Sequence, residues 1–126
     1  MKRIIHTKEA PAAIGPYSQA CLVNRTLYIS GQIPADPQTG RLAEGIEQEA
    51  HQVMKNLKAI LNTAGMDFGD TVKTSIFLKN MNDFAVVNDI YASYFENDRF
   101  PARETVQVSC LPKNVNIEIS MIAYKE

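Results

Sequence analysis

The sequence predicts an α+β fold, in which a single mixed β-sheet carries two helices on one of its faces. One observation is the order of the elements. It reads β-β-β-α-β-α-β-β, from apolar alternation in the strands and 3.6-residue periodicity in the helices. The other is size and composition, because 126 residues with 45% hydrophobic and 21% charged side chains suit one globular domain with one core. We therefore expect residues 1–126 to form a single domain.

Three short strands are expected first, at residues 2–7, 19–24 and 26–30. Asn24 and Arg25 separate the second strand from the third, and asparagine tolerates the positive φ of a two-residue hairpin turn. Gly31 follows Ser30 where the third strand ends. A glycine there lets a ligand or another backbone come close and leaves its N–H free, although Ser-Gly is also a common start of a loop.

The segment between the first two strands, residues 8–18, is predicted to be a long loop. Pro11, Gly15 and Pro16 exclude a helix or a regular strand there. A loop of this length that carries apolar side chains must pack on itself or line something. Two interpretations stay open: a packed surface loop, or the rim of a pocket into which Tyr17 points.

The clearest helix is predicted for residues 46–64, after a loop rich in Pro and Gly. Its apolar side chains form one stripe at helical spacing: Ile46, Ala50, Val53, Met54, Leu57, Ile60, Leu61 and Ala64. Gly65 supplies a left-handed stop. His51 lies beside the stripe and has no second His or Cys at metal-ligand spacing, so we expect no metal site.

A strand over residues 71–79 is followed by a second helix, which begins at Asn82 or Asp83 and runs to about Asn97. Its buried stripe consists of Phe84, Val87, Tyr91, Tyr94 and Phe95. Asn88 lies one position round from that stripe. The residues alone predict a solvated side chain at this position.

Residues 100–124 predict two strands joined by a short turn. The second strand carries an aliphatic row of Val115, Ile117, Ile119 and Met121. Side chains alternate between the faces of a strand, which places both Arg103 and Glu118 on the face opposite this row. An arginine and a glutamate that converge on one sheet face form either a site for a small carboxylate or a structural ion pair.

Apolar side chains are also expected on the sheet face that carries no helix. They are Phe77, Ile122, Tyr124 and Tyr28. A contiguous exposed apolar patch is rare on a monomer. We therefore expect a protein partner to cover this face.

Charge and cysteine content exclude several classes of protein. The net charge is −1, from 13 basic and 14 acidic residues without a basic stripe, so nucleic acid and membrane are not expected partners. Cys21 and Cys110 lie far apart, which predicts neither a disulfide framework nor a zinc site. The N-terminus is too polar for a signal peptide, and no apolar run reaches the roughly 20 residues of a membrane span. These features favour a cytoplasmic protein with reduced thiols.

Several short motifs carry a resemblance to a known family. They are APAAIGPYS at 10–18, SGQIP at 30–34, NLKAI at 56–60, NDFA at 82–85, PAR at 101–103, LPK at 111–113 and IEI at 117–119. In this order and spacing the chain resembles the Rid (YjgF) family, and within it the RidA subgroup of 2-iminobutanoate/2-iminopropanoate deaminases. The resemblance implies a chorismate-mutase-like fold and a homotrimer with three clefts between subunits. It also implies hydrolysis of 2-imino acids to 2-oxo acids and ammonia, with neither metal nor cofactor.

The resemblance also implies roles for particular residues. Arg103 would bind the substrate carboxylate and Glu118 would orient water and transfer protons. Tyr17, Ser30, Gly31, Asn88 and Thr105 would bind substrate, Gly31 and Thr105 through backbone N–H groups. Two positions depart from the family pattern: Thr105 stands where many relatives carry Cys, and Glu104 replaces a small residue. A mechanism that uses a thiol at position 105 is therefore not expected.

Two other functions remain open at this stage. The same clefts could serve a non-catalytic regulator that binds 2-oxo acids, because such a protein needs Arg103 as well. A ribonuclease or inhibitor of translation is also known in the family. The neutral charge argues against the latter, since phosphate contacts dominate affinity for nucleic acid.

Overall fold

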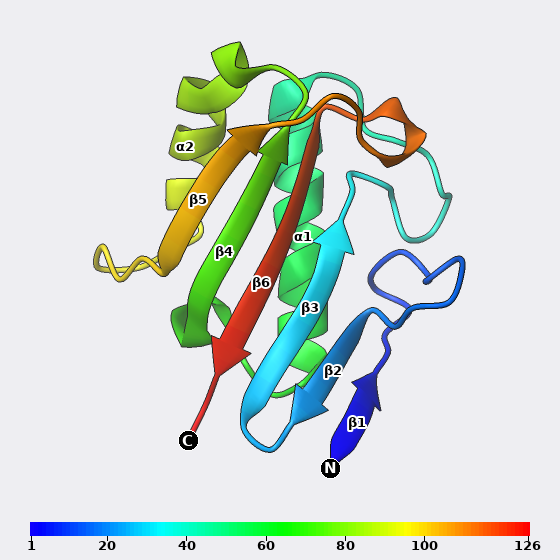
Figure 1. The fold of residues 1–126 in the computed structure, drawn as a ribbon, viewed down its shortest axis with the longest axis vertical. Helices are drawn as coiled ribbons and strands as arrows, with labels where there is room; N and C mark the ends of the chain where they lie inside the picture. The colour runs from blue at the N-terminus through cyan, green and yellow to red at the C-terminus, as the bar shows by residue number, and fades with distance from the viewer.

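The structure is a computed structural model that describes all residues 1–126. One six-stranded sheet, in the order β1-β2-β3-β6-β4-β5, carries both helices on one face, which confirms the predicted α+β class (Figure 1). The elements are β1 Lys2–Ile5, β2 Ala20–Val23, β3 Thr26–Gln32, α1 Ile46–Thr63, β4 Thr71–Leu78, α2 Phe84–Ala92, β5 Ala102–Gln107 and β6 Ile117–Tyr124. Neither helix has the length and hydropathy that a membrane span requires.

The first three strands form an antiparallel meander. Asn24 has φ 55° in the turn between β2 and β3, as its tolerance for positive φ predicted. β3 continues two residues beyond its predicted end, to Gln32, and its register with β6 shifts between Ile29 and Gln32. This irregularity lies at Ser30 and Gly31, where a bulge re-aims the strand.

The core lies between the helices and the inner face of the sheet. The predicted stripe of α1 is buried there, with Val53, Met54, Leu57, Ile60 and Leu61 inaccessible to solvent. Each such side chain contributes about 1.5–3 kcal/mol by burial. Gly65 has φ 76° directly after the helix, as expected of a left-handed stop.

α2 is shorter than predicted, because it ends at Ala92 and not near Asn97. Tyr94 and Phe95 pack against the core from the turns that follow, while Asn97 and Asp98 have φ values of 55° and 54°. Two successive left-handed residues cannot continue a right-handed helix. Most of the predicted aromatic stripe does pack against the core, but its last two members lie beyond the end of the helix.

The predicted short turn between the last two strands is wrong. β4 lies between β5 and β6, parallel to the former and antiparallel to the latter. A parallel pair needs a crossover connection, and α2 supplies it between β4 and β5. The chain from β5 to β6 therefore spans the width of a strand and contains a 3₁₀ turn, Pro112–Asn114.

The other sheet face is bare of helices, as Figure 1 shows. The strand registers place several side chains on this face, namely the paired residues Tyr28 and Ile122, the pair Thr26 and Tyr124, and the pair Phe77 and Val106. Tyr28, Tyr124 and Val106 are 50%, 44% and 40% exposed. We call this surface the open face; its apolar character agrees with the expectation, and its partner stays a prediction.

Candidate functional site

Arg103 lies on β5 and points to the helix side of the sheet. Its Nη1 donates a hydrogen bond to Asn88 Oδ1 of α2 at 2.7 Å. The guanidinium carbon also lies 5.6 Å from the ring centre of Phe84 and 5.3 Å from that of Tyr91. The amide and the two π-faces hold the guanidinium in one orientation. Asn88, predicted to bind substrate, contacts Arg103 directly.

A buried hydrogen bond fixes the ring beneath Arg103. Tyr91 Oη donates to Thr74 Oγ1 at 2.9 Å, and both side chains are buried. Burial raises the pKa of the Tyr91 phenol, so this group stays neutral at physiological pH. Arg103 thus rests on a neutral aromatic support beside a hollow of about 430 Å³, which is lined by Asn88, Tyr91, Ala92, Phe100, Pro101 and Arg103.

Thr105 follows two residues after Arg103 on the same side of β5. Its hydroxyl oxygen is buried and has no hydrogen-bond partner within the chain. A buried polar atom without a partner requires an explanation, because burial without a hydrogen bond costs free energy. Thr105 does not line the hollow beside Arg103.

Glu118 lies on β6 and points to the open face. It reaches into a hollow of about 790 Å³, which opens beside the end of β3 and the start of β6. Tyr17, Ser30, Gly31, Gln32, Ile33 and Lys113 are among the residues that line it. Burial raises the pKa of the Glu118 carboxyl above its usual value, in the direction of neutral pH, where an acid–base group is useful.

Gly31 makes room for this carboxylate. A Cβ atom at position 31 would lie 2.5 Å from Glu118 Oε2 and 2.7 Å from its Cδ. Any other residue would therefore displace Glu118. Glycine is required here because a side chain would collide with Glu118. It is not required for the backbone conformation, since φ of Gly31 is not positive.

Two buried amides hold the walls of the hollow. Gln19 Nε2 donates to the carbonyl oxygens of Thr7, Ala10 and Pro11, while its Oε1 accepts from Thr7 N at 2.7 Å. Asn56 Nδ2 donates to the carbonyl oxygens of Ile33 and Ala35 at 3.1 and 3.0 Å. The loop before β2 and the loop after β3 are thus each fixed by one side chain.

The structure corrects the predicted convergence of Arg103 and Glu118. Thr74 of β4 is the register partner of Arg103, and Phe77 is the partner of Glu118. Thr74 faces the helices and Phe77 the open face, so the two charged side chains lie on opposite faces. They are also two strands and three residues apart, roughly 10 Å in each direction.

The predicted residues therefore form two half-sites in one chain. Tyr17, Ser30, Gly31 and Glu118 line the larger hollow, which we call the glutamate half-site. Asn88 and Arg103 line the smaller one, the arginine half-site, and Thr105 lies next to Arg103 in sequence. Within one chain the two half-sites do not meet.

Sequence reasoning named Phe84, Asn88 and Tyr91 but missed that they support Arg103. It also missed Gln19 and Asn56 as supports of the other half-site. Phe84, Asn88 and Tyr91 stand at i, i+4 and i+7 on α2, a spacing that places them on one helix face. This spacing would have indicated a support for Arg103. No comparable signal marks Gln19 or Asn56, because a buried amide that binds backbone carbonyls has no periodicity.

The fold agrees with comparisons to known proteins. The chain belongs to the family described as Endoribonuclease L-PSP, whose model matches residues 7–125, and this confirms the Rid (YjgF) resemblance. The 2-iminobutanoate/2-iminopropanoate deaminase of Homo sapiens is 52% identical over 124 residues, which cover 98% of this chain and 90% of the human protein.

Two solved structures show the same fold. A Thermotoga maritima protein described as a putative endoribonuclease has a TM-score of 0.97 and 50% identity, and the match covers 100% of this chain and 99% of that one. E. coli TdcF with bound serine has a TM-score of 0.94 and 40% identity, with 98% and 99% covered.

Proposed function

We propose that this protein hydrolyses 2-imino acids to 2-oxo acids and ammonia, in clefts that two copies of the chain complete together. The observation that carries the proposal is the pair of half-sites. A preorganised guanidinium lies on one sheet face, and a carboxylate of raised pKa lies in a hollow on the other. The human relative, which is 52% identical over 124 residues, is named for this activity.

Arg103 is suited to bind the substrate carboxylate. A guanidinium offers two parallel N–H groups to a carboxylate, a geometry that an ammonium group lacks. Asn88 occupies Nη1, which leaves other N–H groups of Arg103 free for the substrate. The aromatic support restricts the side chain before substrate arrives, so little entropy is lost on binding.

Glu118 is suited to move the protons of hydrolysis. As a base it takes a proton from water while the water oxygen bonds to the imine carbon, whose C=N electron pair moves to nitrogen. Nitrogen takes this proton from Glu118, which gives a carbinolamine. Glu118 then takes the proton of the carbinol O–H and passes it to nitrogen as the C–N bond breaks, so ammonia leaves and the carbinol oxygen becomes the carbonyl oxygen of the 2-oxo acid. No covalent intermediate with the protein is needed.

A second copy of the chain would bring the half-sites together. Arg103 lies on β5, the edge strand of the sheet, where a neighbouring chain has access to it. The apolar open face supplies a surface for that neighbour. A closed ring of identical contacts joins the arginine half-site of each chain to the glutamate half-site of the next. We infer a homotrimer, as the family resemblance implies.

The solved relative with bound serine supports the class of substrate. In serine a carboxylate and a nitrogen share one carbon atom, and a 2-imino acid has the same arrangement. The substrates proposed for this chain, 2-iminobutanoate and 2-iminopropanoate, place these groups within reach of a guanidinium and a general acid–base group.

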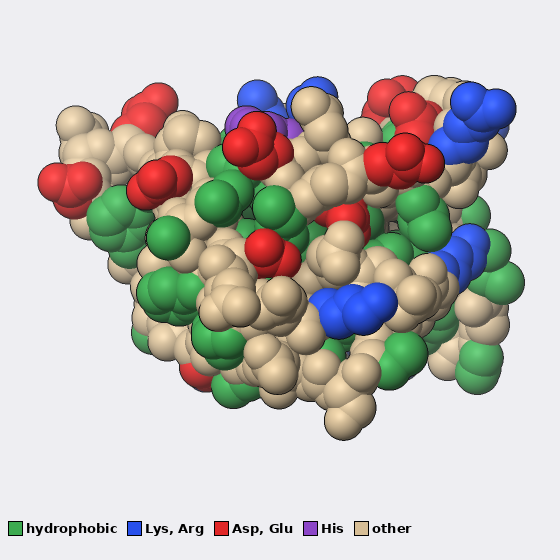
Figure 2. Space-filling view, turned by 90° about the horizontal axis from the view of Figure 1, so that it is seen from above, with side chains coloured by type: hydrophobic (Ala, Val, Ile, Leu, Met, Phe, Trp, Pro, Cys, Tyr) green, Lys and Arg blue, Asp and Glu red, His purple; other side chains and the backbone are tan.

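RNA cleavage is the alternative that the description of the family suggests. Lys and Arg side chains are interspersed with Asp and Glu on the molecular face that contains the ends of β3, β4 and β5 (Figure 2). This face shows no basic groove for a phosphate backbone, and the chain as a whole carries a net charge of −1. We therefore favour the deaminase.

The proposal is tested by following the decay of an imine released by a threonine dehydratase. Added protein should accelerate formation of ammonia and 2-oxobutanoate. The substitution Arg103→Ala should abolish the acceleration, whereas Arg99→Ala, which removes an arginine outside both half-sites, should retain it. Binding of 2-oxobutanoate without any acceleration would refute catalysis and leave a ligand-binding regulator.

A further inference from the structure

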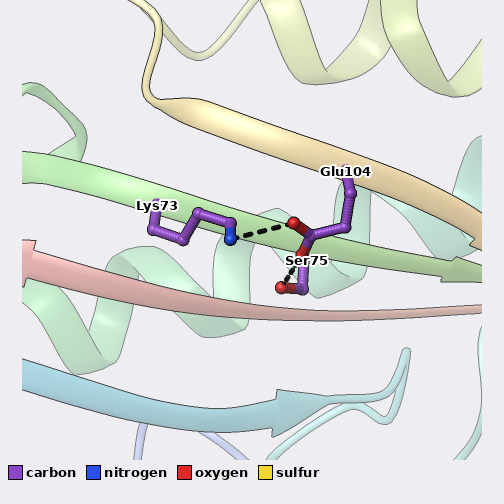
Figure 3. A network of polar contacts seen from close by, with 3 residues as sticks. All are labelled: Lys73, Ser75 and Glu104. Carbon is purple, nitrogen blue, oxygen red and sulfur yellow. Dashed lines mark hydrogen bonds and ion pairs between the residues drawn. The ribbon is translucent and has the colours of Figure 1, made fainter.

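A small polar network stands on the open face, on the two strands β4 and β5 at one edge of the sheet. Lys73 Nζ lies 2.9 Å from Glu104 Oε1, and Ser75 Oγ donates a hydrogen bond to Glu104 Oε2. Figure 3 shows Lys73 and Ser75 on β4 and Glu104 on the neighbouring β5. Glu104 and Ser75 are register partners, so the contact follows directly from the pairing of the two strands.

Several apolar side chains adjoin this network. The pair Phe77–Val106 lies two residues further along the same two strands, and Ile122 is the register partner of Lys73 on β6. Lys73 and Glu104 are 42% and 46% exposed in the single chain. At this exposure an ion pair contributes little to stability, so the fold of one chain does not explain why the two charges are there.

The position of Glu104 suggests an explanation. It follows Arg103 directly on the edge strand β5, so the side chains of Arg103 and Glu104 point to opposite faces of the sheet. A second copy that completes the cleft around Arg103 must approach β5, and it then also approaches Glu104. A charge enclosed there would lose its water, and only a partner charge already in place would compensate for this loss.

We propose that the Lys73–Glu104 pair neutralises the open face so that a second copy of this chain can pack on it, and that removal of either charge alone prevents stable assembly. The occupant is another copy because the side chains beside the pair are largely apolar and the pair itself carries no net charge. A strongly charged partner would find no complementary field here. This inference rests on the assembly in the proposed function.

Oligomeric state measured against protein concentration, by light scattering and mass photometry, tests the proposal. The variants are Glu104→Ala, Lys73→Met and the double variant Lys73→Met/Glu104→Leu, with Glu47→Ala on the exposed side of α1 as the control. Each single charge removal should raise the dissociation concentration at least about tenfold, because the remaining charge is buried alone. The double variant should assemble at least as tightly as the wild type.

Circular dichroism distinguishes a folded monomer from an unfolded chain, and the two single variants test the same charge balance independently. Wild-type protein that is monomeric at all concentrations would overturn this inference together with the proposed assembly. A wild-type oligomer that Glu104→Ala and Lys73→Met leave unchanged would overturn the inference alone. So would a double variant as weakly assembled as the single ones, because the effect would then not be one of charge.

Discussion

Glu118 combines two properties that a structural carboxylate rarely has. It is partly withdrawn from water, and this burial raises its pKa, yet no hydrogen bond or cation within the chain compensates its charge. We expect kcat to rise with pH through this raised pKa, because the unprotonated carboxylate activates water. Glu118→Gln should lower kcat by about 10²–10⁴-fold and remove this limb from the pH profile. An unchanged profile would exclude Glu118 as the base.

The same carboxyl should lower the stability of the native state. Its pKa is higher in the folded state than in the unfolded one, so the folded state binds the proton more tightly. The free energy of unfolding therefore falls as pH rises between these two pKa values, and the loss is complete above the folded value. Glu118→Gln should melt at the same or a higher temperature than wild type at neutral pH, and the difference should vanish in acid.

Gly31 offers a test of how closely Glu118 must be placed. In Gly31→Ala the new Cβ would overlap the carboxylate, which is the far end of a flexible side chain and can swing away without unfolding the strand. We expect a melting temperature close to wild type and a kcat reduced about 10²-fold or more, toward that of Glu118→Gln. The loss should appear in kcat more than in KM.

Gly69→Ala is the matched control for this substitution. Its Cβ would also meet a carboxylate oxygen, Asp67 Oδ1, at 3.0 Å, but Gly69 lines neither half-site. Its kcat should remain that of the wild type. If Gly31→Ala turned over normally, Glu118 would not depend on the space that glycine leaves.

At the level of elements, the loop before β2 depends on one side chain. Gln19 is 2% exposed and makes four hydrogen bonds to backbone groups of residues 7–11. Gln19→Met keeps the length of the side chain but leaves these groups unpaired, which should cost about 1–3 kcal/mol of unfolding free energy. Because the loop carries Tyr17 to the glutamate half-site, KM should rise while kcat changes less.

Gln48→Met, on the exposed surface of α1, is the control for this prediction. Denaturant titration gives the free energy of unfolding, and steady-state kinetics give KM and kcat. A Gln19→Met protein with normal stability and normal KM would show that the loop is held by other contacts.

The elements also show what sequence periodicity can and cannot predict. Alternation assigned Ile117, Ile119 and Met121 to the core correctly, because one strand alone decides which of its side chains share a face. It could not decide whether Arg103 and Glu118 share a face, since that depends on the register with β4, a strand from elsewhere in the chain. Only the pairing with β4 shows that the Arg103 side chain points to the face of the sheet that carries the helices.

The candidate residues themselves came mainly from the family motifs. Periodicity suggested Arg103 and Glu118 as a pair, but on one face of a single chain, whereas the structure separates them. Tyr17, Ser30 and Gly31 do gather around Glu118, because the irregularity in β3 and the loop fixed by Gln19 meet at the start of β6. No local pattern connects segments so distant in sequence.

At the scale of the whole molecule, the division of the site between two chains predicts complementation. Arg103→Ala destroys the arginine half-site and Glu118→Gln the glutamate half-site, so each pure variant should be inactive. In mixed rings, a cleft is intact wherever a chain with normal Arg103 meets a chain with normal Glu118. After random mixing in equal amounts, about a quarter of the clefts should be intact. The mixture should therefore recover about a quarter of the wild-type activity.

The measurement is imine hydrolysis after the two variants have been unfolded together, mixed and refolded, compared with each variant refolded alone. A mixture of either variant with the double variant Arg103→Ala/Glu118→Gln is the control, because no cleft in it can combine both residues. Recovery in the first mixture only would show that each cleft takes its guanidinium and its carboxylate from different chains. If the first mixture stayed as inactive as the control, both groups would have to act within one chain, where the strand register keeps them on opposite faces, and the composite site would be refuted.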